Sequence, residues 1–191
     1  MSKFTPSVHE KPSEYFNVKE EKQYKLRIMS EIIDGFFGWT EVLVEGKKKR
    51  KPLRFKTLKE ANQVEFSHGK YDDPSKPVIP KQFWATIVWN YELEIFQVWE
   101  ITQKGIMKQL DSLANHSDWG DFKNYDLTIE RINNQPVEYP ILSSPSKPVS
   151  KEISSAFKKL KYNLELLYDG GHPISGVKKD KEESAAVEPA F

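Results

Sequence analysis

The sequence contains no cysteine. This absence excludes a disulfide framework and any zinc site with thiolate ligands, and it fits a reducing compartment. The chain also lacks a run of about 18 apolar residues, which a membrane-spanning helix needs, and residues 1–16 lack the apolar core of a signal peptide. The net charge is only +1, so any binding to a polyanion must depend on where the charges lie. We therefore expect a cytoplasmic protein with no membrane partner.

A chain of 191 residues is long enough for one domain with a substantial core and flanking segments. The C-terminal end of the chain is rich in charged and small residues and cannot bury enough apolar surface to fold alone. We expect a flexible N-terminal arm (1–20), one folded domain (21–171) and a disordered acidic C-terminal tail (172–191). Within the domain we expect a basic and proline-rich insertion (46–80) and a helical segment (150–168).

The pattern of apolar residues is mainly that of β-strands. Residues 23–29, "QYKLRIM", alternate with the period of two expected for a half-buried strand. Residues 83–90 and 94–101 are rich in β-branched and aromatic residues and predict an antiparallel hairpin. A short amphipathic helix follows in 102–116, and two further strands are predicted in 125–132 and 137–143.

Five strands with one helix between the third and the fourth is the chain order of the OB-fold, a small Greek-key barrel that binds oligonucleotides. The predicted fold class is mainly β with short helices. In detail, we expect a five-stranded OB-fold barrel with an enlarged first connection, a C-terminal helical segment and a disordered tail.

The stretch 83–99, "FWATIVWNYELEIFQVW", contains many aromatic rings. Only one parity of each barrel strand can enter the core, so some of these rings should face outward. We expect Trp84 and Phe96 to be the outward ones. Outward rings can stack on the bases of a single strand, whereas the alternative is that they are buried under the long insertion or the C-terminal helix.

Basic residues gather between Gly46 and Lys59, where eight of them occur with no acidic residue. This run is predicted to form a loop or hairpin tip, and lysine and arginine there could contact phosphates. The polar face of the first strand is also basic. The candidate DNA-binding residues are Lys25, Arg27, Trp39, Lys47, Lys48, Lys49, Arg50, Lys51, Arg54, Lys56, Trp84, Trp89, Tyr91 and Phe96.

Several motifs resemble one family. The stretches "FWATIVWNYELEIFQVWEITQKGIMKQL", "DWGDFKNYDLTIERI", "SSPSKPVS" and "YNLELLYDGG" are similar to the single-stranded-DNA-binding proteins of tailed phages. The resemblance spans roughly 24–171. It implies an OB barrel that holds single-stranded DNA in a basic, aromatic cleft during replication and recombination, without catalysis and without a cofactor. It also implies the cytoplasm of the host cell, and the lack of cysteine excludes a zinc-stabilised version.

The end of the chain, "EESAAVEPAF", looks like the acidic tail closed by phenylalanine that proteins of this class present to replication or recombination enzymes. Its candidate partner-binding residues are Glu182, Glu183, Glu188 and Phe191. The alternative is an ordinary disordered terminus.

Two other function classes stay open. Asp118, Asp121 and Asp126 could gather around a magnesium ion, which would indicate a metal-dependent nuclease or another nucleic-acid-processing enzyme. The glycine and asparagine between them are also typical of turns, which aspartate favours in any case. The third class is a structural protein whose aromatic surface meets another protein.

Overall fold

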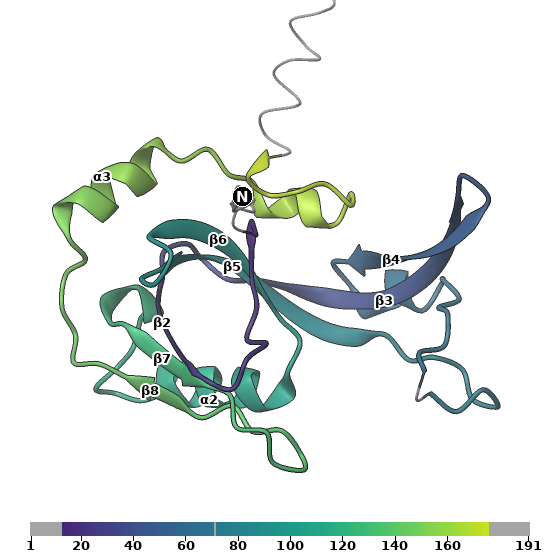
Figure 1. Ribbon diagram of the computed structural model, residues 1–191, viewed down its shortest axis with the longest axis horizontal. Coiled ribbons are helices and arrows are strands. Elements are labelled where there is room, and N and C mark those ends of the chain that lie inside the picture. The colour runs from purple at the N-terminus through teal and green to yellow at the C-terminus, as the bar shows by residue number, and fades with distance from the viewer. Residues whose placement is uncertain (1–12, 71, 176–191) are drawn as a thin grey trace, which may run out of the picture.

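The computed structural model describes residues 13–70 and 72–175 (Figure 1). The strands are β1 (Tyr15–Phe16), β2 (Gln23–Ile28), β3 (Ile33–Val44), β4 (Lys47–Phe55), β5 (Lys81–Asn90), β6 (Ile95–Ile101), β7 (Leu127–Glu130) and β8 (Ile141–Ser143). The α-helices are α1 (Leu58–Ala61), α2 (Lys104–Ala114) and α3 (Lys151–Lys159), and the 3₁₀ helices are η1 (Phe122–Asn124) and η2 (Leu164–Leu167). The predicted mainly β class with short helices is confirmed. No helix within the described ranges is long and apolar enough to cross a membrane.

All strands belong to one mixed sheet. Its main path runs β1-β6-β5-β2-β7-β8, and β3 pairs with β5 and with β4. The predicted antiparallel hairpin is confirmed as β5 and β6, and among the described strands the β1–β6 pair alone is parallel. The sheet curls (Figure 1), but β1 and β8, at the two ends of the path, do not pair with each other. The sheet is therefore open.

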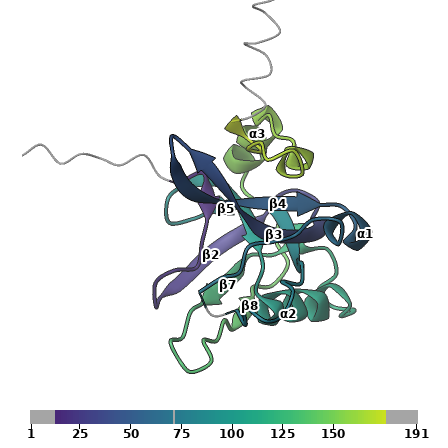
Figure 2. The same cartoon turned by 90° about the vertical axis from the view of Figure 1, so that its right-hand side faces the viewer.

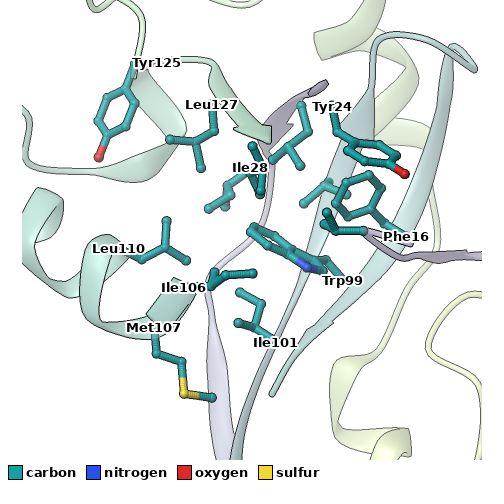
Figure 3. Packing of buried hydrophobic residues seen from close by; sticks show 14 residues of the cluster. Phe16, Tyr24, Ile28, Trp99, Ile101, Ile106, Met107, Leu110, Tyr125 and Leu127 are labelled. Atoms are coloured by element: carbon teal, nitrogen blue, oxygen red, sulfur yellow. The ribbon is translucent and has the colours of Figure 1, made fainter. Parts of the chain in front are cut away.

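The main core lies inside the curled sheet (Figure 3). The indole of Trp99 is almost completely buried there, among side chains of β2, β6 and β7. Helix α2 contributes Ile106, Met107 and Leu110, whose spacing places them on one face of the helix. Each such buried side chain contributes about 1.5–3 kcal/mol relative to an exposed one. This helix is the amphipathic helix that the sequence predicted.

Part of the expected N-terminal arm is folded. Residues 13–20 were expected to be flexible, but β1 adds a parallel strand to β6, and Phe16 and Val18 are buried in the main core. The side chain of Gln97 donates a hydrogen bond of 2.6 Å to the backbone oxygen of Ser13. The edge of β6 offers backbone partners that local sequence patterns do not reveal, so the boundary at residue 20 was wrong.

The basic run forms a strand that begins at the tip of a hairpin, so of the two predicted forms the hairpin tip is the nearer and the loop was wrong. β3 and β4 pair over nine positions, from Phe36 with Phe55 to Val44 with Lys47, and we call this ribbon the basic hairpin. Its two-residue turn needs positive φ at Glu45 and Gly46, which have φ of 51° and 74°. Farther down, the ring of Phe66 lies so close to Gly38 that a Cβ there would come within 2.3 Å of it.

The end of the described chain, residues 151–175, forms what we call the C-terminal segment. It contains α3 and η2, which confirms the predicted helical segment 150–168 as two short helices. Figure 2 shows α3 on the opposite side of the sheet from α2. Leu164, Leu167 and Ile174 are buried against β5 and β6. Residues 172–175 were expected in the tail, yet Ile174 packs because the face of the sheet under it is apolar.

His172 fastens the end of this segment, and we expect it to make the segment sensitive to acid. Its Nδ1 accepts hydrogen bonds of 3.1 Å from the backbone N–H groups of Ile174 and Ser175. Burial lowers the pKa of His172, although Glu14 opposes this effect. The folded form therefore binds this proton less well than the unfolded form, and the stabilisation is lost as the pH falls from the ordinary pKa of 6.5 through the folded value.

Hydrogen exchange at the amide of Ile174 checks this expectation. Hydroxide catalyses this exchange, so below pH 6.5 the measured rate should fall less than the intrinsic rate does, and His172→Ala should remove this difference. His116→Gln, which changes an exposed imidazole, serves as the control. An Ile174 amide whose protection does not change with pH would contradict the assigned role of His172.

Candidate nucleic-acid interface

The two faces of β5 and β6 carry different rings. Trp84 and Val88 pack toward the main core, and Trp99 lies with them. Phe83, Ala85, Ile87 and Trp89 alternate with these and lie on the outer face, together with Phe96 and Val98 of β6. Phe96 lies on the outer face, as expected, but packs against Phe157 of α3, and the expectation for Trp84 was wrong. Both faces of the hairpin are apolar, so alternation alone could not tell which one encloses the main core.

The middle of this outer face is covered by the C-terminal segment. Leu167 packs on Phe83 and Ala85, while Leu164 and Ile174 pack on Ile87 and Val98. All four of these sheet side chains are fully buried. The alternative that rings are buried under the C-terminal helix therefore holds for Phe83. The outer face is open only toward its two ends.

At one end lies a groove of about 600 Å³, which we call the hairpin groove. Phe37, Trp39 and Pro52 of the basic hairpin form one side. Residues of β1 and the Gly170–Gly171 turn also line the groove, and Gly170 lies next to Lys51 of the hairpin. Trp39 is 40 % exposed, and the guanidinium of Arg50 lies over its ring at 5.4 Å from the centroid. A large aromatic ring is thus presented at the wall of a groove with a cation beside it.

The positive charge of the basic hairpin is mostly unpaired. Lys47, Lys48, Lys49, Arg50 and Lys51 are all exposed. Lys48 forms an ion pair of 3.1 Å with Glu41, but the other four form no ion pair with any residue in the described ranges. The hairpin therefore carries a row of exposed cations, of which Lys51 lines the groove. Such a row attracts phosphates and weakens with salt.

Two of the predicted phosphate contacts are already bound to carboxylates. Arg54 is 11 % exposed and donates two hydrogen bonds, of 2.9 and 2.8 Å, to Glu100 at the floor of the hairpin groove. Lys56 forms an ion pair with Glu165 and lies over the ring of Tyr168, 5.2 Å from its centroid. Both residues hold the hairpin and the C-terminal segment to the sheet, which their sequence position did not indicate.

Arg27 is not available to a ligand, so its assignment as a DNA contact was wrong. Its side chain is 1 % exposed, and its Nε donates a 2.7 Å hydrogen bond to the equally buried Asp126. The remaining guanidinium nitrogens bond to the backbone oxygens of Lys123 and Lys147. A buried charge needs such a partner, and this one lies 99 positions away in the sequence.

Asp126 gathers further groups around it, and we call them the Asp126 cluster. The ammonium groups of Lys147 and Lys25 lie 3.0 and 3.6 Å from its Oδ2, and the hydroxyl of Tyr91 donates a 2.8 Å hydrogen bond to Oδ1. Burial alone would raise the pKa of Asp126, but the bonds from Lys147, Arg27 and Tyr91 hold it below its ordinary value. Burial and the bond to Asp126 raise the pKa of Tyr91 to about 12.

A second groove, of about 430 Å³, lies beside this cluster. Trp89 and Tyr91 line its sheet side, and Ile153 and Ala156 of α3 line the other. The Trp89 ring packs edge-on against Phe96, with the centroids 4.8 Å apart, and Phe96 in turn contacts Phe157 of α3. We call it the Trp89 groove.

The three aspartates of the nuclease alternative do not form one site. Asp126 is bound to cations, Asp121 caps η1 by accepting the N–H of Lys123, and Asp118 lies at an exposed turn next to His116. In the described part of the chain, no group of three or more His, Asp or Glu side chains could hold a metal ion. The turn interpretation of Asp118 and Asp121 agrees with these positions.

The predicted residues thus separate into two groups. Trp39, Lys51 and Arg54 line the hairpin groove, and the rest of the run 47–51 continues along the same hairpin. Trp89 and Tyr91 line the Trp89 groove, and Lys25 lies over the Tyr91 ring. Sequence reasoning missed Phe37 and Lys147. Phe37 alternates with Trp39 in one strand, a signal that could have found it, but no local pattern marks Lys147. The predicted tail contacts Glu182, Glu183, Glu188 and Phe191 lie outside the described residues.

Comparison with known proteins found no relative of this chain. No family model matches the chain, and no curated protein or solved structure matches it. The likeness to phage single-stranded-DNA-binding proteins therefore rests on the quoted sequence motifs.

Proposed function

We propose that the protein binds single-stranded DNA without sequence specificity and coats it during phage replication and recombination. The observation that carries this proposal is the row of exposed cations on the basic hairpin beside the partly exposed ring of Trp39. Cations along a groove follow the phosphates, and an aromatic ring at its wall stacks on a base. Binding of this kind needs no catalytic residue and no cofactor.

The arrangement of strands supports the same proposal. β2, β5, β6, α2, β7 and β8 follow the chain order of an OB-fold, and the basic hairpin lies in the connection between the first two of these strands. In OB-folds the face of the second and third strands and the first connection bind oligonucleotides. The hairpin groove lies between that connection and the end of that face. We extend the proposal to an OB-type domain whose tail, residues 182–191, recruits replication or recombination enzymes.

A titration of tryptophan fluorescence with an oligothymidylate of about 16 nucleotides tests the proposed function, because OB domains cover about 4–16 nucleotides. We expect quenching that prefers the single strand over duplex competitor. The logarithm of the affinity should fall with the logarithm of salt, by about 0.7 for each phosphate contacted. If no quenching or change in anisotropy of a labelled oligonucleotide occurs at low salt, the proposed function is wrong.

Replacing Trp39 tests the stacking contact. Trp39→Ala should weaken binding by about 1–3 kcal/mol, the usual value for one base stacked on one ring, without changing the salt dependence. Anisotropy of a labelled oligothymidylate measures both quantities. Trp119→Phe is a matched control, because Trp119 packs against the main core and lies away from the hairpin groove. Equal affinities of Trp39→Ala and the wild-type protein would contradict the assignment of this ring.

A further inference from the structure

We propose that Lys25 and Lys147 form a second phosphate-binding point, and that one single strand contacts both it and the hairpin groove. This inference rests on the proposed function, because it concerns where the same strand continues. Lys147 was not among the residues that the sequence indicated.

The Asp126 cluster has an excess of positive charge. Three cationic side chains, Lys25, Arg27 and Lys147, approach one buried carboxylate. Arg27 is buried and fully bonded, whereas Lys25 and Lys147 are 50 % and 52 % exposed. One negative charge cannot neutralise three positive ones, so two half-exposed ammonium groups carry an excess of positive charge. Both are held near the same oxygen, Oδ2 of Asp126, and are therefore positioned before a ligand arrives.

Two aromatic rings lie next to these ammonium groups. The ammonium of Lys25 lies 4.8 Å from the centroid of the Tyr91 ring, and the Tyr91 hydroxyl is fixed by Asp126. Trp89 lies in the same groove and is only partly buried. Glu94 and Glu152 also line this groove and repel a phosphate there. A nucleotide would therefore place its phosphate on Lys25 and Lys147 and its base toward Trp89 and Tyr91.

The C-terminal segment covers the outer face of the sheet between the hairpin groove and the Trp89 groove. Figure 1 shows the basic hairpin on one side and α3 on the other, with the last described residues between them. Leu164, Leu167 and Ile174 fill the outer face between Phe83 and Ile87. Six residues of β5, or about 20 Å of strand, separate Phe83 from Trp89. A strand in the hairpin groove must therefore pass around the C-terminal segment to reach the Asp126 cluster, which takes a longer path than the direct one along the sheet.

Oligothymidylates of about 4 and about 16 nucleotides separate the two points, and Lys25→Gln/Lys147→Gln is the test variant. Binding of the longer one should weaken roughly tenfold, and its salt slope should fall by about 1.4, because about 0.7 is lost for each phosphate contact. Binding of the shorter one, held in the hairpin groove, should not change. Lys25→Arg/Lys147→Arg should restore the affinity, since it keeps both charges.

The control is Lys22→Gln/Lys108→Gln, which also removes two lysines. Lys22 is already paired with Glu20 and Glu92, and Lys108 lies exposed on α2. The melting temperature of each variant shows whether it is folded. If the double variant is unfolded, Lys25→Gln alone serves, because its contact with Asp126 is the longer one; its salt slope should fall by about 0.7.

Three outcomes would overturn the inference. One is unchanged binding of the longer oligonucleotide in a folded double variant, and another is an equal loss for both lengths. The third combines two results: excess inorganic phosphate raises the melting temperature of the wild-type protein but not of the variant, and oligonucleotide binding is the same in both. This result would mean a site for free phosphate. A wild-type protein that binds neither length would refute the proposed function itself, which is a different result from all three.

Discussion

Replacing Lys47, Lys48, Lys49 and Lys51 with glutamine should weaken binding of single-stranded DNA roughly 100-fold at low salt. These side chains are exposed, and three of them form no ion pair in the described ranges, so their charge is available to phosphates. The slope of log affinity against log salt should fall by up to about 0.7 for each lysine that contacts a phosphate. Anisotropy of a labelled oligothymidylate at several salt concentrations measures both effects.

The matched control replaces four exposed lysines elsewhere on the chain: Lys19, Lys76, Lys108 and Lys159. It changes the net charge equally, so a comparable loss in both variants would mean that total charge, and not the basic hairpin, drives binding. Gel filtration of each variant should accompany the measurement, since it shows whether the altered hairpin still leaves the protein in its wild-type state of association.

Removing the carboxylate of Asp126 should lower the free energy of unfolding by about 3–5 kcal/mol, because Asp126→Ala leaves the guanidinium of Arg27 buried without a counter-ion. Urea denaturation at neutral pH measures the loss. Asp118→Ala is the control, since Asp118 is 78 % exposed and lies 3.9 Å from the exposed ring of His116. The double variant Arg27→Met/Asp126→Leu should regain part of the stability, because neither charge is then left alone.

The same pair gives the protein a defined response to acid. Because the folded pKa of Asp126 lies below its ordinary value of 3.8, the stabilisation is fully present above that value. It is lost as the pH falls through the folded pKa. The difference in stability between the wild-type protein and Asp126→Asn should therefore shrink in this acidic window. A difference that stays constant with pH would contradict the assigned role of the ion pair.

The parts of the fold that the sequence predicted are those with a local pattern. The strands around Leu26 and from Phe83 to Ile101 alternate regularly, and α2 repeats its apolar residues at helical spacing. β4 was missed because five consecutive cations are typical of a loop. They form a strand here because β3 supplies backbone partners along the whole run, and the side chains stay in water on both faces.

In the candidate site, too, the residues close together in sequence were predicted and those that depend on distant partners were not. The basic hairpin and Trp39 are close in sequence and were predicted together. Arg27 was misjudged because its buried partner, Asp126, is distant in sequence, and Trp84 because the outer face of the same hairpin is also covered. Lys147 was missed since only the folded chain brings it to Asp126. Ion pairs between residues far apart in sequence decide which charged side chains are available to a ligand. The periodicity of the sequence does not indicate these pairs.

The position of β4 has a consequence for self-association. Among the residues that the structure describes, β4 pairs with β3 alone, so its outer edge offers backbone groups that could join a strand of another molecule. Lysine on an edge strand opposes such joining, because two copies of the run 47–51 would bring ten positive charges together. The residues that we assign to phosphate contact would therefore also oppose aggregation through this edge.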